Sequence, residues 1–182
     1  MDILNLPNLK TVSVVETHDA FHITAEPTST VPCCIKCGTI REHNLKRFGT
    51  KEQVYMDTPI RGKRVAIHIK RQRYRCIDCN QTFYEPLHDM HDNHFATVRF
   101  VEYIEQEVLR NTFTSVATNV GVDEKLVRNI FNAFNDRLNQ NYKPVFPKWI
   151  GIDEIHLIGR PRCIITDIAN KTVIDFLPTR SM

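Results

Sequence analysis

Two short cysteine pairs, Cys34-Ile-Lys-Cys37 and Cys76-Ile-Asp-Cys79, decide how this chain of 182 residues folds, and 38 residues separate them. Each CxxC loop turns two thiolates back onto one point, and two such loops supply the four sulfur ligands of a closed tetrahedral Zn²⁺ site. Redox-active thiols and a disulfide framework are the alternatives. Two pairs in one segment argue against the first, and the absence of any secretion-like signal argues against the second. We therefore predict a structural zinc ion held by these four cysteines.

The residues next to the two loops support this prediction. Gly38 and Asn80 directly follow the pairs, and both residue types suit the tight turn that a zinc knuckle needs. Cys33 stands beside Cys34 and is an alternative ligand, although Cys34 gives the regular spacing. Cys163 lies in an apolar run and is expected to be a small core residue.

The charge of the chain is unevenly distributed. Its net charge is +3, but residues 41–80 carry eleven Lys or Arg against four Asp or Glu, a local net charge of +7. This asymmetry indicates a polyanionic partner such as duplex DNA, with a solvated basic surface as the alternative. No apolar run approaches the ~18 residues of a membrane span, so we expect a cytoplasmic protein without a membrane partner.

Residues 63–76 are expected to form a strand that contributes much of this charge. With a period of two, an apolar stripe on one face continues as Arg71, Arg73 and Arg75 near the second cysteine pair. Guanidinium groups about 7 Å apart match a phosphate backbone. The alternative is a solvent-exposed sheet edge protected by charge.

A helix-turn-helix is predicted after an amphipathic helix over residues 96–110. Ala117, Gly121 and Val127 have the spacing of a small residue at the helix crossing, a glycine at the turn and a branched residue that packs back. Asp123 is expected to cap the second helix. The alternative is a helical hairpin with a polar surface.

The second helix of this unit would expose side chains that suit DNA. Arg and Asn pair with guanine and adenine edges, and Lys suits phosphate. The candidate DNA-binding residues of the helix are Lys125, Arg128, Asn129 and Asn132.

A linker with two prolines lies at residues 142–148. The residue pattern changes from helical to strand-like after it, and three short strands are expected there. The fold class is therefore α+β. We predict a β-rich zinc-binding domain over residues 1–92, a helix-turn-helix domain over 93–142 and an incomplete β-hairpin region over 143–182.

In this order, the motifs resemble those of insertion-sequence transposases of the third ISL group. The resemblance lies in the two cysteine loops, the Ala117/Gly121/Val127 unit and Ile150-Gly-Ile-Asp-Glu154. It implies binding to the terminal inverted repeats of a mobile element, and it leaves a homodimer open.

The same resemblance implies a ribonuclease H-like DDE catalytic domain that begins near residue 143. Asp153 would be its first carboxylate, and two Mg²⁺ ions would need three such acids. The other two are expected beyond residue 182, so we expect a truncated catalytic domain and no strand transfer from this chain alone. The competing interpretations are a zinc and helix-turn-helix transcription regulator, and a nuclease that uses Asp153 with Asp167.

Overall fold

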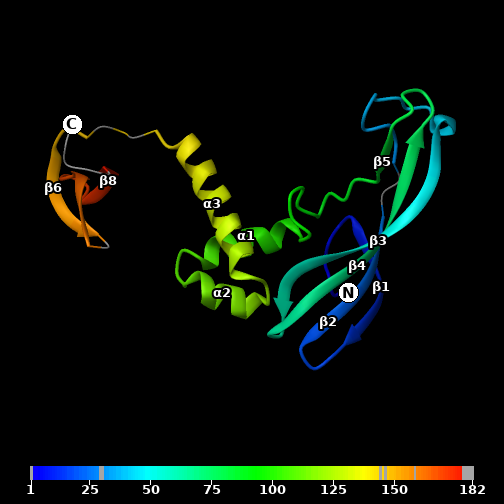
Figure 1. Ribbon diagram of the computed structural model, residues 1–182, viewed down its shortest axis with the longest axis horizontal. Helices are drawn as coiled ribbons and strands as arrows, with labels where there is room; N and C mark the ends of the chain where they lie inside the picture. Colours follow the sequence, from blue (N-terminus) through cyan, green and yellow to red (C-terminus); the bar gives the residue numbers. More distant parts are fainter. Residues whose placement is uncertain (1, 29–30, 144, 146, 158, 178–182) are drawn as a thin grey trace. The chain divides into compact units, whose positions relative to one another are not determined.

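The computed structural model describes residues 2–28, 31–143, 145, 147–157 and 159–177. Contacts divide the chain into two units, residues 1–135 and 136–182. The elements in chain order are β1 Leu9–Glu16, β2 Ala20–Pro27, the 3-10 turn Glu42–Asn44, β3 Leu45–Ile60, β4 Lys63–Cys76, β5 Thr82–Tyr84, α1 Val98–Glu107, α2 Phe113–Val120, α3 Glu124–Asn141, β6 Ile150–Leu157, β7 Arg160–Asp167 and β8 Thr172–Leu177 (Figure 1).

The first unit is built on a sheet with the strand order β1-β2-β4-β3, to which β5 adds beside β4. β2 pairs with β4 in parallel over its residues 20–25, whereas β3 follows β4 antiparallel along nearly its whole length. The long β3–β4 hairpin therefore continues beyond β1 and β2 towards the cysteine loops (Figure 1). Each CxxC loop adjoins this extension, so the hairpin supports the metal site.

The strand prediction for residues 63–76 is confirmed with the same bounds. Its partner β3 is 16 residues long and begins at Leu45. Its register shifts between Arg47 and Thr50, where Gly49 has φ +84°. A bulge at this glycine lets β3 remain paired with β4 where its own alternation of polar and apolar residues is weak.

One face of the sheet forms the core of the first unit. Val65, Ile67 and Ile69 of β4 are almost completely buried, as the period-two pattern predicts. They pack with Phe21 and Ile23 of β2. The apolar stripe therefore ends in β4 where the neighbouring strand β2 ends, and the arginines begin there.

The three helices of the first unit form a second core. Phe100, Val101 and Ile104 of α1 are buried, which confirms the predicted amphipathic face. The helix begins at Val98 instead of residue 96 because the Thr97 side chain accepts a hydrogen bond from the Phe100 backbone N–H at 3.2 Å.

The helix-turn-helix geometry follows the sequence spacing closely. Gly121 ends α2 with φ +75°, and its N–H donates to the Ala117 carbonyl at 2.8 Å. Val127 of α3 is fully buried in the same cluster as Ala117. Asp123 caps α3, because its carboxylate accepts the Lys125 backbone N–H at 2.7 Å.

A buried carboxylate connects the sheet to the helices. Asp57 of β3 accepts hydrogen bonds from the Thr97 hydroxyl at 2.7 Å and from Nε of Arg99 at 2.8 Å. Asp57 is only 2 % exposed, so these two partners compensate a charge that water does not reach. The contact positions the start of α1 beside β3.

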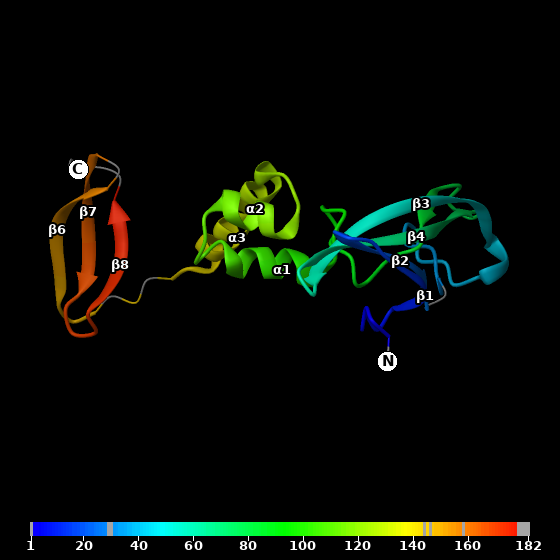
Figure 2. The same cartoon turned by 90° about the horizontal axis from the view of Figure 1, so that it is seen from below.

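After the last residues of α3, the second unit contains the antiparallel sheet β6-β7-β8 (Figure 2). Its three strands confirm those expected after residue 148. Large apolar side chains remain exposed on it, with Ile152 at 66 % and Phe176 at 47 %. Three strands need packing on a hydrophobic face for independent stability, and this sheet leaves much of its apolar surface uncovered. None of the helices that the structure describes is long and apolar enough to span a bilayer.

Candidate zinc site and DNA-binding surface

The four cysteines of the two CxxC loops lie together at the far end of the β3–β4 hairpin. The sulfur atoms of Cys34 and Cys79 are 3.8 Å apart, as are those of Cys37 and Cys76, and all four lie within 4.8 Å of one another. A tetrahedron with Zn–S bonds of about 2.3 Å requires S···S separations of about 3.8 Å. These four residues would hold a structural Zn²⁺.

The two cysteine loops have the same backbone design. The N–H of Cys34 donates to the carbonyl of Thr39 and the N–H of Cys76 to that of Gln81, each at 2.9 Å. Gly38 and Asn80 have φ of +75° and +56°, so both occupy the left-handed conformation expected from their place after the loops. The sequence therefore predicted both turns correctly.

The sulfur atoms affect one another's protonation. Burial raises the pKa of Cys34, but the backbone N–H groups of Cys37 and Lys36 outweigh it and lower the pKa to about 7. A hydrogen bond from the Thr39 backbone lowers the pKa of Cys37, but burial and the neighbouring sulfurs outweigh it and raise the pKa to about 12. Four thiolates this close require a cation to compensate their charge, and Zn²⁺ would supply it.

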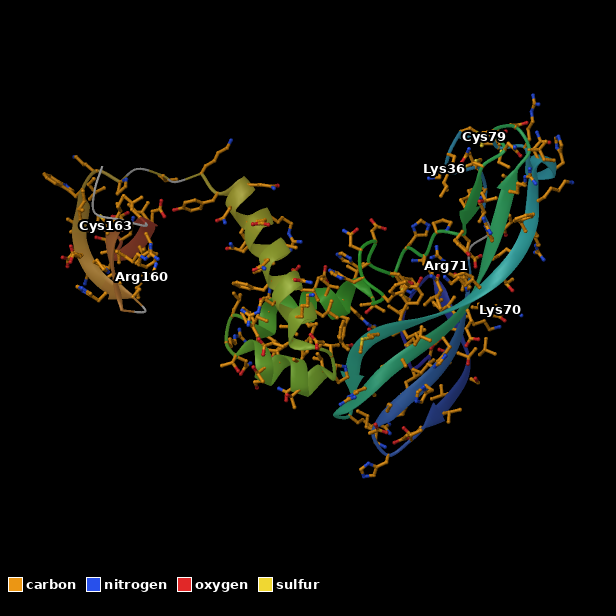
Figure 3. All side chains as sticks on the ribbon, viewed as in Figure 1. Lys36, Lys70, Arg71, Cys79, Arg160 and Cys163 are labelled. Atoms are coloured by element: carbon orange, nitrogen blue, oxygen red, sulfur yellow. The ribbon has the colours of Figure 1, made fainter. Side chains whose placement is uncertain are left out.

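The two remaining cysteines lie outside this group. Cys34 is buried among the four sulfurs, whereas Cys33 is half-buried and does not belong to the group. Cys163 is half-buried on β7 of the second unit (Figure 3).

The three arginines of β4 lie in the extension of the hairpin, among aromatic rings. Arg71 and Arg73 lie over the ring of Tyr84, with guanidinium carbons 5.4 and 5.9 Å from its centroid. Arg73 and Arg75 lie over Phe48 at 5.3 and 5.8 Å. Such contacts hold the guanidinium groups in an ordered row. Their contact with phosphate stays a prediction.

Arg71 differs from the free phosphate ligand that the sequence suggested. Its guanidinium donates to the Gln53 side chain at 3.0 Å, to the Tyr55 hydroxyl at 3.2 Å and to the Glu85 carbonyl at 2.5 Å. Figure 3 shows Arg71 partway along the hairpin, below the cysteine end marked by Cys79. Because these acceptors belong to the protein, Arg71 fastens the segment after β5 to the sheet. Arg75, by contrast, is exposed, with Asn80 as its partner.

The candidate base-reading residues share one face of α3. Lys125, Arg128, Asn129 and Asn132 are all exposed, and their spacing of three, four and seven residues from Lys125 places them on adjacent turns. The opposite face of the helix carries Val127 and is buried. The structure thus gathers the four residues on one exposed surface, and their contact with bases stays a prediction.

Arg128 does not extend freely from this surface. One of its guanidinium nitrogens lies 2.5 Å from a carboxylate oxygen of Glu124, and its guanidinium carbon lies 4.8 Å from the centroid of the Phe113 ring. The other carboxylate oxygen of Glu124 accepts from the Thr114 hydroxyl at 2.8 Å. Arg128 is therefore oriented by residues of both helices.

The acidic residues of the second unit are spread out. Asp153 pairs across the sheet with Ile164, whereas Asp167 pairs with Ile150 at the strand end. The Asp167 carboxylate accepts from the backbone of Ala169 and Asn170, and these bonds fix the β7–β8 turn. Within the described part of the chain, the four cysteines are the one group of three or more potential metal ligands. Asp153 therefore belongs to no group of three or more potential metal ligands among these residues.

The fold and the sulfur cluster define a protein with a zinc ribbon followed by a helix-turn-helix DNA-binding domain. Residues 30–79 match the family described as the zinc-finger of transposase IS204/IS1001/IS1096/IS1165, and residues 85–135 match the helix-turn-helix domain of transposase family ISL3. Together the two matches identify residues 30–135 as similar to the N-terminal region of an ISL3-type transposase. Comparisons with curated proteins and with solved structures found no match.

Several residues that shape this surface were not predicted from the sequence. Phe48 and Tyr84 are separated by 36 positions, yet both lie against the arginines. Asp57 and Arg99 have no local pattern that pairs them. The Glu124–Arg128 pair has the i,i+4 spacing of a helix ion pair, so this one contact was open to prediction.

Proposed function

We propose that this chain recognises the terminal inverted repeats of an insertion sequence and is the DNA-recognition part of its transposase. The observation that carries the proposal is the exposed face of α3, where Arg128 and Asn129 lie side by side on a helix held by a helix-turn-helix core. Arg pairs bidentately with guanine and Asn with adenine in the major groove. The helix therefore has the side chains needed to discriminate bases.

The zinc ribbon supplies the second part of the proposed function. The hairpin that contains β4 is basic, and the zinc ion stiffens its end. Arg73 and Arg75 are the side chains that we propose for contact with the phosphate backbone, and Arg71 mainly supports them. Phosphate contacts give affinity and orientation without sequence information.

Residues 143–182 are proposed to begin a ribonuclease H-like catalytic domain, with Asp153 at the position of the first carboxylate. Its uncovered apolar side chains support this proposal, because a larger domain would bury them. Two Mg²⁺ ions require several hard oxygen ligands, and the bonds of Asp167 commit that residue to its own turn. We therefore expect no strand transfer from this chain alone. Mg²⁺-dependent nicking that is lost in Asp153→Asn would contradict this.

Binding selection from random duplexes, followed by footprinting on the element and its flanks, tests the proposed function. We expect protection at the element ends. Arg128→Ala/Asn129→Ala should reduce the ratio of specific to random affinity by about 10-fold or more, since a bidentate contact contributes about 1–3 kcal/mol of discrimination. Arg110→Ala/Asn93→Ala, which removes the same residue types at exposed positions outside α3, is the matched control.

The outcomes separate the alternatives. Protection of a promoter instead of the element ends would indicate a transcription regulator. Arg73→Ala/Arg75→Ala should weaken binding to all duplexes equally. Equal losses on specific and random DNA from both pairs of substitutions would contradict the proposed division between base reading and phosphate binding.

A further inference from the structure

The turn between β3 and β4 reaches the helix-turn-helix. It consists of Arg61 and Gly62, both with positive φ, and Lys63 and Arg64 follow at the start of β4. The Arg64 side chain crosses directly over Gly121, the residue that ends α2. A Cβ atom built on Gly121 would lie 2.0 Å from Nε of Arg64. The basic turn therefore contacts the helix-turn-helix at its own turn (Figure 1).

The contact lies beside the helix that is proposed to read DNA. Arg64 borders a shallow depression together with Thr114 near the start of α2 and with Asp123 and Glu124 at the start of α3. In a helix-turn-helix, the first residues of the second helix approach the bases, and the first helix crosses the backbone. Arg64 is thus placed at the rim of the surface that faces the duplex.

The charges of this turn are not all used within the protein. Lys63 is committed, because its ammonium group donates to Glu16 at 2.6 Å and to the Thr17 carbonyl at 2.7 Å. Arg61 and Arg64 are exposed, and neither side chain has a hydrogen bond or ion pair with the residues that the structure describes. Arg64 at the rim and Arg61 in the adjoining turn are therefore available to an anionic partner. The Lys63 hydrogen bond is the main cause that lowers the pKa of Glu16, and the charge of Arg61 also helps to lower it.

The nearby acids do not neutralise Arg64. Glu124 pairs with Arg128 and with the Thr114 hydroxyl, and Asp123 caps α3. Both carboxylates have partners of their own, so the guanidinium of Arg64 stays free for phosphate oxygens, which it can bind in a bidentate manner.

We infer that the β3–β4 turn is a second DNA-contacting element, in which Arg61 and Arg64 bind backbone phosphates next to the groove entered by α3. This inference rests on the proposed DNA-binding function and extends it. It gives the sheet a direct part in recognition: contacts from a second element fix the orientation of α3 on the duplex. The protected region should accordingly extend beyond the base pairs that α3 covers.

The salt dependence of DNA affinity tests this inference in the full chain. Each phosphate contact contributes about 0.9 to the slope of log K against log salt, so Arg61→Ala/Arg64→Ala should reduce the slope by about 1.8. The base preference found by selection should not change, and hydroxyl-radical protection should disappear on one flank only. Lys10→Ala/Lys148→Ala removes two exposed charges elsewhere and should retain the slope.

Arg64 also packs on Gly121, so a folding defect must be separated from a lost contact. Arg61→Ala alone removes an exposed side chain without a hydrogen bond or ion pair in the described part of the chain, and it should lower the slope by about 0.9. Arg64→Lys retains the charge and should retain most of the slope. A double variant that folds yet shows the wild-type slope and footprint overturns the inference, while the proposed function stands. Failure of the wild-type chain to prefer any duplex would instead overturn the proposed function.

Discussion

Glu124 and Arg128 meet on the exposed side of α3, with 2.5 Å between a carboxylate oxygen and a guanidinium nitrogen. Arg128 is the residue we expect to read a base, and Glu124 sits at the start of the same helix. Because Thr114 of α2 holds Glu124 from the other side, the carboxylate cannot turn away without losing a second bond. The pair thus orients Arg128 and also places a negative charge close to the expected path of DNA.

Glu124→Gln should separate these two effects. Loss of the negative charge should raise affinity for random duplexes, while weaker orientation of Arg128 should lower the ratio of specific to random affinity by several-fold. Competition binding at two salt concentrations measures both quantities. Glu102→Gln, an exposed acid on α1, is the control and should change neither. An increased specificity ratio would show that Glu124 only opposes binding.

The contact between Arg128 and Glu124 should be lost only when the pH falls below the ordinary pKa of a glutamate. The Thr114 hydroxyl and then Arg128 hold the pKa of Glu124 below its ordinary value of 4.5. For an acid with a lowered folded-state pKa, the stabilisation is present above the unfolded value and is lost as the pH falls through the folded value. The contact should therefore persist at pH 5. NMR titration of the Glu124 carboxyl in the wild type and in Thr114→Ala measures this, and the variant should have the higher pKa.

Loss of zinc should unfold the end of the hairpin. A structural zinc ion contributes on the order of 10 kcal/mol of folding free energy, so Cys76→Ser should abolish stoichiometric zinc and DNA binding together. Elemental analysis and circular dichroism check this. Cys33→Ser and Cys163→Ser should retain one zinc per chain, because both residues lie outside the sulfur group. Loss of zinc in Cys33→Ser would mean that Cys33 is a ligand.

Loss of the ion pair between Asp57 of β3 and Arg99 of α1 should destabilise the first unit more when Arg99 is replaced than when Asp57 is replaced. Arg99→Met leaves the buried Asp57 carboxylate without a positively charged partner. It should destabilise the first unit by about 3–5 kcal/mol. Asp57→Ala leaves Arg99, whose side chain is 35 % exposed and can be hydrated. It also leaves the buried Thr97 hydroxyl without its acceptor, so we expect a smaller loss of about 1–3 kcal/mol. Urea unfolding with zinc present measures both. Asp92→Ala, an exposed acid, should change the unfolding free energy by less than about 0.5 kcal/mol.

Gly121→Ala should lower the free energy of unfolding by more than the cost of placing an alanine in the left-handed backbone conformation. Gly62 has nearly the same φ, +74°, but a Cβ there meets nothing within 4 Å, so Gly62→Ala pays only the left-handed cost of about 1–2 kcal/mol. At Gly121 the new methyl group also strikes Arg64. Addition of Arg64→Ala to Gly121→Ala should recover the difference, and a double-mutant cycle by thermal unfolding measures it. Equal costs at the two glycines would show that Arg64 moves aside freely.

The sequence by itself determined the local parts of this protein. Residue spacing was sufficient for the CxxC loops with Gly38 and Asn80, and for the helix turn at Gly121, because each motif depends on neighbours within a few positions. The alternation of β4 likewise predicted its buried face. Only the tertiary structure decided which charges are free. Arg71 donates hydrogen bonds to residues as distant as Gln53 and Glu85, whereas Arg64 lies over Gly121 without a hydrogen bond in the described part of the chain. The sequence could not predict this difference, because partners far apart in the chain produce no local periodicity or spacing.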